Sequence, residues 1–131
     1  MNTRILMSTS AIWNGIVGAG FLFVSAEIMA LIDIQTNQAM ELIMQAFGAA
    51  LLGWAMLNWM AKGILIGGIY ARPVALGNFL SFTAPFISLF KFDLDIYPFG
   101  WVLLPVYGFF AISFAKVLFT HPKTANPDSN T

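Results

Sequence analysis

The stretch that decides the fold is AMELIMQAFGAALLGWAMLNWMA, residues 39–61, in which Glu41 is the single charged residue. It shows no sustained alternation of polar and apolar positions, which argues against a strand. The hydrocarbon core of a bilayer is roughly 30 Å thick and takes about 20 apolar residues in a helix. The stretch therefore predicts one transmembrane helix.

Three further apolar stretches flank it, at residues 7–32, 73–90 and 98–119. Each approaches the length of a membrane span, although the first is long enough to tilt and the stretch at 73–90 is somewhat short. The sequence predicts an all-α protein, an integral membrane bundle of four transmembrane helices within residues 1–120. Residues 121–131, rich in proline and small polar residues, predict a disordered tail.

Composition agrees with this class and excludes others. Hydrophobic residues make up 59% of the chain and charged residues 9%, whereas a soluble domain carries roughly 25% charged residues. Six Lys and Arg balance six Asp and Glu, so no basic excess predicts a nucleic-acid partner. Cysteine is absent, and the one histidine, His121, lies in the tail. We expect no enzyme activity, no cofactor and no metal site.

The charged residues predict the orientation. If the four helices alternate in direction, five of the six cations fall on one side of the membrane and five of the six acids on the other. The first group is Arg4, Lys62, Arg72, Lys116 and Lys123, and the second is Glu27, Asp33, Glu41, Asp93 and Asp95. Cytoplasmic loops are enriched in Lys and Arg, so both termini are predicted to be cytoplasmic.

The N-terminus allows one alternative. Arg4, the apolar run after it and the small residues Val24-Ser25-Ala26 are similar to a signal peptide with its cleavage site. Against this, the basic region is thin, the run contains Asn14, and its apolar character continues to Ile32. We expect an uncleaved first span.

Small residues recur at helical spacing in every stretch. Lipid tails are as apolar as leucine, so transmembrane helices associate through close backbone contact at such residues. The expected packing faces are Ala11, Gly15 and Ala19; Ala46, Ala49, Ala50 and Gly53; Gly77, Ser81, Ala84 and Ser88; and Gly108, Ala111 and Ala115.

Acidic residues at the ends of the first two spans form a candidate ion site. Glu27 and Glu41 lie nearest the hydrocarbon, Gln45 is one turn from Glu41, and Lys91 ends the third span on the same side. A carboxylate within a membrane is a functional candidate by default. The alternative is structural, because Glu41 suits a helix N-terminus and both acids can reach the headgroups.

Amides on the inner side form a second candidate site. Asn14, Asn58, Asn78 and Ser81, with Arg72 at the mouth of the third span, would line a polar cavity for a lipid headgroup or small solute. The alternative is that the amides hydrogen-bond between helices and hold them together, each worth about 1 kcal/mol.

Two segments, GAALLGWAMLNWMAK at 48–62 and IYARPVALGN at 69–78, resemble small bacterial four-helix membrane proteins of unknown function. In those proteins a second helix rich in Gly and Ala leads through a short basic link to a similar Arg…Gly-Asn segment. The resemblance implies the four-helix architecture and a bacterial inner membrane. It assigns no role to any residue.

From these observations we expect a small integral membrane protein that acts by helix packing. Its partners would be the lipid bilayer and either further copies of itself or the subunits of a larger membrane complex. Two alternatives stay open. One is an oligomeric transporter or channel for a small ion or solute that uses Glu27 and Glu41, and the other is a lipid-binding protein that uses the side of Arg72 and Asn78.

Overall fold

The computed structural model describes residues 2–63, 71–91 and 99–120. Within these residues the chain is entirely helical apart from turns and caps, which confirms the all-α prediction. The helices are α1 (Thr3–Phe23), α2 (Ser25–Leu31), α3 (Gln38–Ala61), α4 (Arg72–Leu89) and α5 (Gly100–Phe119). The tail predicted to be disordered, residues 121–131, lies outside the described part.

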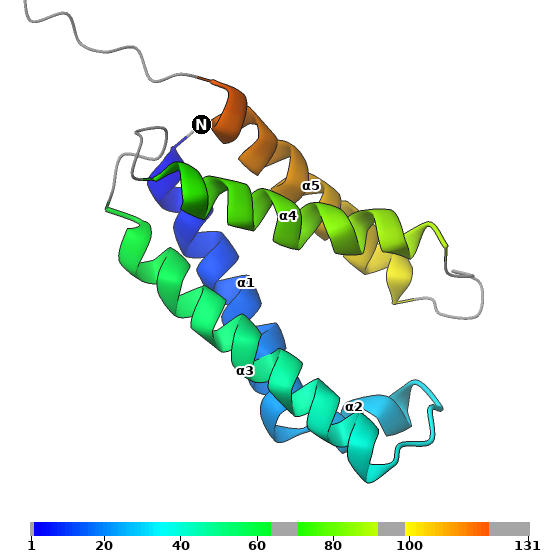
Figure 1. The fold of residues 1–131 in the computed structure, drawn as a ribbon. Coiled ribbons are helices and arrows are strands. Elements are labelled where there is room, and N and C mark those ends of the chain that lie inside the picture. The colour runs from blue at the N-terminus through cyan, green and yellow to red at the C-terminus, as the bar shows by residue number, and fades with distance from the viewer. Residues whose placement is uncertain (1, 64–70, 92–98, 121–131) are drawn as a thin grey trace, which may run out of the picture.

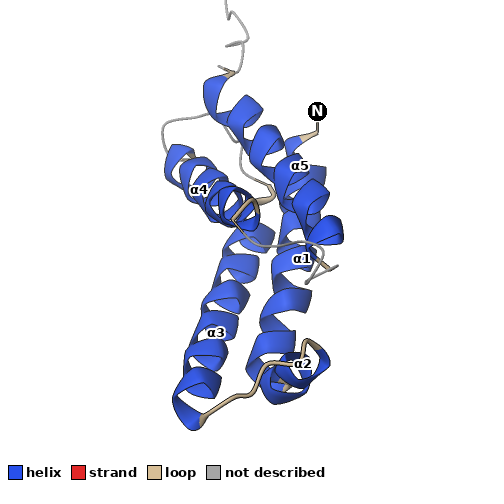
Figure 2. Cartoon of the chain, turned by 90° about the vertical axis from the view of Figure 1, so that its right-hand side faces the viewer, coloured by secondary structure: helices blue, strands red, loops and turns tan. Residues whose placement is uncertain are grey.

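The long helices form two hairpins, α1 with α3 and α4 with α5, which meet at one end and diverge from there (Figure 1). The start of α1, the end of α3, the start of α4 and the end of α5 lie at the meeting end. The view turned by 90° places the short α2 at the opposite end of the α1–α3 hairpin (Figure 2). The two hairpins therefore share a junction at one end only.

The α1–α3 hairpin is held by a close backbone crossing. A Cβ atom added at Gly18 would lie 2.8 Å from the carbonyl oxygen of Gly48, and one added at Gly48 would lie 2.6 Å from the amide nitrogen of Leu22. No side chain larger than glycine fits at such distances. Gly15 is less constrained, since its Cβ would meet the Cβ of Ala55 at 3.8 Å.

The packing face of α3 differs from the expected one. Gly48, Ala55 and Asn58 are buried against α1, whereas the small residues expected to pack are exposed. These are Ala46, Ala49, Ala50 and Gly53. The glycine at 48 moves the crossing to the opposite side of the helix, because it allows an approach that alanine does not.

The first apolar stretch, expected as one span over residues 7–32, is divided. The helix breaks at Val24, whose φ of −132° and ψ of 35° are not helical, and α2 starts at the next residue. The short α2 packs closely against the end of α1, since a Cβ at Gly20 would lie 3.3 Å from Cδ1 of Ile28 in α2.

Aromatic side chains fill the core where the hairpins meet. Phe82 of α4 is buried and stacks on Phe110 and Phe114 of α5, with ring centroids 4.6 and 5.8 Å apart. Met7 and Leu6 of α1 are buried in the same cluster. Burial of rings with offset or stacked geometry adds about 0.5–1.5 kcal/mol per pair beyond the area buried.

Three of the described helices, α1, α3 and α5, are long and apolar enough to cross a membrane. The remaining expected span, over residues 73–90 (α4), does not reach the same hydropathy, because Arg72, two prolines and Asn78 fall within α4. These three helices therefore support the prediction of a membrane protein.

Asp33 offers a test of the turn that ends α2. Its φ of 57° is left-handed, and the amide of Ile34 donates to the carbonyl of Met29 at 3.0 Å, as in a Schellman motif. Glycine adopts this conformation without the Cβ clash. We expect Asp33→Gly to raise the free energy of unfolding by about 0.5–1 kcal/mol and Asp33→Ala to lower it, measured by thermal unfolding in detergent. A destabilised Asp33→Gly variant would contradict the assignment.

Candidate functional site

A buried polar cluster lies where α1, α3 and α4 come together. Ser10 of α1, Asn58 of α3 and Asn78 of α4 are all fully buried, and Trp54 of α3 adjoins them. We call these four residues the polar junction. It sits at the shared end of the two hairpins, beside the aromatic core.

The two asparagines of the polar junction face each other as a reciprocal amide pair. Asn58 Nδ2 donates to Asn78 Oδ1 at 2.7 Å, and Asn78 Nδ2 donates to Asn58 Oδ1 at 2.7 Å. The second donations go from Asn58 to Ser10 Oγ at 3.0 Å and from Asn78 to the carbonyl of Val74 at 2.9 Å. Trp54 Nε1 also donates to Asn78 Oδ1, at 3.1 Å. Every N–H of both amides is therefore used.

A glycine makes room for the tryptophan. A Cβ at Gly77 would lie 2.5 Å from Cη2 of Trp54, so the indole rests against the bare backbone of α4. Trp54 stands four residues before Asn58 and therefore on the same face of α3. This placement brings its N–H to Asn78, the residue after Gly77.

The polar junction is neutral, and its donors are satisfied by its own members and by the backbone carbonyls of Val74 and Met7. It contains no charged group. Between helices in a low-dielectric environment, such bonds are worth about 0.6–2 kcal/mol each. A half-satisfied network would be costly, whereas a satisfied one fixes one arrangement of the helices. Its hydrogen bonds join α4 to α3 and α3 to α1.

Of the residues predicted to line a polar cavity, the structure brings Asn58 and Asn78 into contact. Asn14 is buried one turn from Ser10, and its Nδ2 has no hydrogen-bond partner among the described residues. Arg72 and Ser81 are exposed on α4. The interhelical role of the amides, the alternative raised by the sequence, matches the contacts of the first two.

Of the predicted ion-binding residues, Lys91 lies on the other hairpin from Glu27, Glu41 and Gln45. Glu27 is exposed on α2, and Glu41 at the start of α3 accepts a hydrogen bond from Thr36 Oγ1 at 3.2 Å. Gln45 is exposed, and Lys91 follows α4, on the other hairpin. Figure 1 shows the end of α4 well separated from α2 and the start of α3. In the described ranges no three acidic or histidine side chains are close enough to hold a metal ion.

Sequence reasoning missed Ser10 and Trp54 as members of the polar junction. Both carried a signal. Ser10 and Asn14 are polar residues four apart within an apolar span, and Trp54 and Asn58 have the same spacing in the next span. Polar side chains on one face of each helix predict that these faces meet.

Comparisons with known proteins give no relative from which a role could be transferred: no protein-family model matches the chain, and neither a curated protein nor a solved structure is similar to it.

Proposed function

We propose that this chain is a four-span protein of a bacterial inner membrane, with both termini in the cytoplasm, which acts by association through α3. The partner is a second copy of the chain or a subunit of a larger membrane complex. The additional span is α4, whose buried Asn78 is accommodated by the polar junction rather than by lipid.

The distribution of charge in the fold supports this orientation. Apart from Lys91, which follows α4, the described cations lie at the meeting end of the hairpins. The described acids lie at the opposite end of the α1–α3 hairpin. The cations are Arg4, Lys62, Arg72 and Lys116, and the acids are Glu27, Asp33 and Glu41. Lys and Arg are retained on the cytoplasmic side, so the meeting end is the cytoplasmic one.

The observation that supports the proposed function most strongly is the exposed side of α3, against which no described helix packs. In the most apolar segment of α3 only 6% of the residues are buried, whereas in the corresponding segments of α1 and α5 33% are. The small residues on this side define what we call the α3 outer face: Ala46, Ala49, Ala50 and Gly53. A Cβ at Gly53 would have no atom within 4 Å.

A glycine in a helix is destabilising by roughly 0.5–1 kcal/mol relative to alanine. At Gly18 and Gly48 the close crossing of α1 and α3 accounts for it, but no contact within the described chain does so at Gly53. Ala49 and Gly53, four residues apart, have the spacing that lets a second helix approach closely. Association explains this face better than transport does, because Lys91 lies on the other hairpin from Glu27 and Glu41 and does not complete the expected ion site.

Native mass spectrometry of protein extracted gently from its own membranes tests the proposal. We expect an oligomer or a defined complex for the natural chain and the mass of a single chain for Gly53→Ile, because the added side chain holds the partner helix away. The control, Val102→Phe, adds bulk at an exposed position of α5 and should leave the assembly intact. A single-chain mass for the natural protein in every mild detergent, or an unaltered assembly for Gly53→Ile, would refute it.

A further inference from the structure

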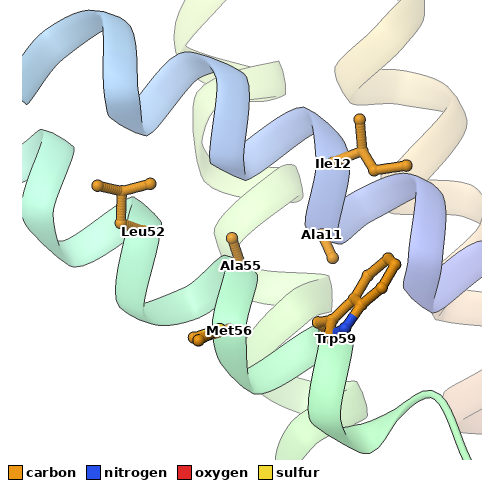
Figure 3. A pocket seen from close by; sticks show the side chains of 6 residues that line it. All are labelled: Ala11, Ile12, Leu52, Ala55, Met56 and Trp59. Carbon is orange, nitrogen blue, oxygen red and sulfur yellow. The ribbon is translucent and has the colours of Figure 1, made fainter.

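The α1–α3 hairpin carries an apolar groove between its two helices, next to the α3 outer face. The groove has a volume of about 450 Å³ and is lined by Ala11, Ile12, Leu52, Ala55, Met56 and Trp59 (Figure 3). Ala11 and Ala55 are buried, whereas Ile12, Met56 and Trp59 remain about half exposed or more. Small residues thus form its floor and larger ones its walls. Its lining is almost entirely apolar, which suits a hydrocarbon chain.

One end of the groove is built differently from the other. Figure 3 shows the ring of Trp59 reaching from α3 towards α1 at this end, with Leu52 at the other. Nζ of Lys62 lies 3.1 Å from the centroid of the Trp59 ring, a cation–π contact. Tryptophan prefers the headgroup level of a bilayer, so this end of the groove lies at the membrane surface.

A second cation stands on the facing helix. Arg4 is exposed and lies seven residues before Ala11, which is two helical turns, so it is on the same face of α1 and about 10 Å further towards the meeting end. Arg4 and Lys62 therefore flank the mouth of the groove from α1 and α3. The helix ends described around this mouth carry cations and no acid.

We propose that an anionic phospholipid occupies this groove, with one acyl chain against Ala11 and Ala55 and its phosphate between Arg4 and Lys62. The inference rests on the membrane placement proposed above, but it concerns the groove between α1 and α3 rather than the α3 outer face. The apolar groove matches the acyl chain of a lipid, and the two cations and the aromatic ring at its end match an anionic headgroup. A zwitterionic lipid has the same chains but gains less from the cations, since its headgroup has no net charge.

The test uses the full chain purified in a neutral detergent with equal amounts of phosphatidylglycerol and phosphatidylcholine, followed by native mass spectrometry. We expect phosphatidylglycerol to be retained preferentially. Arg4→Gln and Lys62→Gln should each weaken this retention roughly fivefold, the effect of one Lys or Arg near an anionic surface. Lys116→Gln is the matched control, because it removes the same charge at the same end of the fold but on α5.

Three results would overturn the proposal: equal retention of the two lipids, unchanged retention in Arg4→Gln and Lys62→Gln, or an equal loss in Lys116→Gln. The last would indicate attraction by net charge alone. The same spectra report the mass of the assembly, so loss of association and loss of lipid are read separately. A chain recovered outside the membrane fraction would refute both proposals, whereas a membrane assembly without phosphatidylglycerol would refute this one alone.

Discussion

Gly48→Ala is expected to destabilise the protein by about 1–3 kcal/mol or more, the usual range for forcing extra volume into a packed site. The added Cβ would lie 2.6 Å from the amide nitrogen of Leu22, 2.7 Å from the carbonyl oxygen of Gly18 and 2.9 Å from the carbonyl carbon of Phe21. All three are backbone atoms of α1, which cannot rotate away as a side chain would. The two helices must therefore separate.

The matched control for this prediction is Gly15→Ala on α1. Its Cβ would meet the Cβ of Ala55 at 3.8 Å, an ordinary van der Waals contact, so stability should stay within about 0.5 kcal/mol or rise slightly. The free energy of unfolding of both variants is measured in mixed micelles with increasing denaturing detergent. If Gly48→Ala is as stable as Gly15→Ala, the close crossing of α1 and α3 is not as described.

Asn78→Leu should lower the free energy of unfolding by about 1–3 kcal/mol, because it leaves Asn58 buried with unsatisfied amide groups. Trp54 loses its acceptor in the same variant. The double variant Asn58→Leu/Asn78→Leu removes both amides together. We therefore expect it to be clearly more stable than the sum of the two single losses predicts, with a coupling energy of about 1–2 kcal/mol.

The control for the amide pair is Ser81→Ala, which changes an exposed polar residue on the same helix and should alter stability by less than about 0.5 kcal/mol. The four variants of the cycle and the control are compared by the same unfolding assay. Additive losses from the two asparagine substitutions would show that the reciprocal pair does not join α3 to α4.

The helical class, and the position of three of the four long helices, follow from hydropathy because a run of apolar residues of this length has few alternatives. The break at Val24 does not follow from it, since the apolar character of the chain continues through Val24 to Ile32. The packing face of α3 was expected at Ala46, Ala49, Ala50 and Gly53. Spacing alone does not distinguish a small residue that packs inside the chain from one that stays exposed.

The candidate site was predictable to a similar degree. Because Asn58 and Asn78 lie inside apolar spans, the sequence predicts that their amides hydrogen-bond within the protein. The structure shows that they bond to each other. Which residues complete the polar junction depends on the approach of the helices, and this depends on Gly77, where the bare backbone admits Trp54. Glu27 and Lys91 are grouped in the prediction because both are expected on the same side of the membrane. They lie on different hairpins, and a shared side of the membrane does not place two residues in contact.

The most direct test of the four-span arrangement uses single cysteines, which the natural chain lacks. Gln35→Cys, Gly63→Cys and Lys91→Cys are exposed positions after α2, after α3 and after α4. In intact cells, a maleimide that does not cross membranes should label the cysteines at 35 and 91 and should reach the cysteine at 63 only after permeabilisation. Labelling of positions 63 and 91 from the same side would show that α4 does not cross the membrane and would contradict the account.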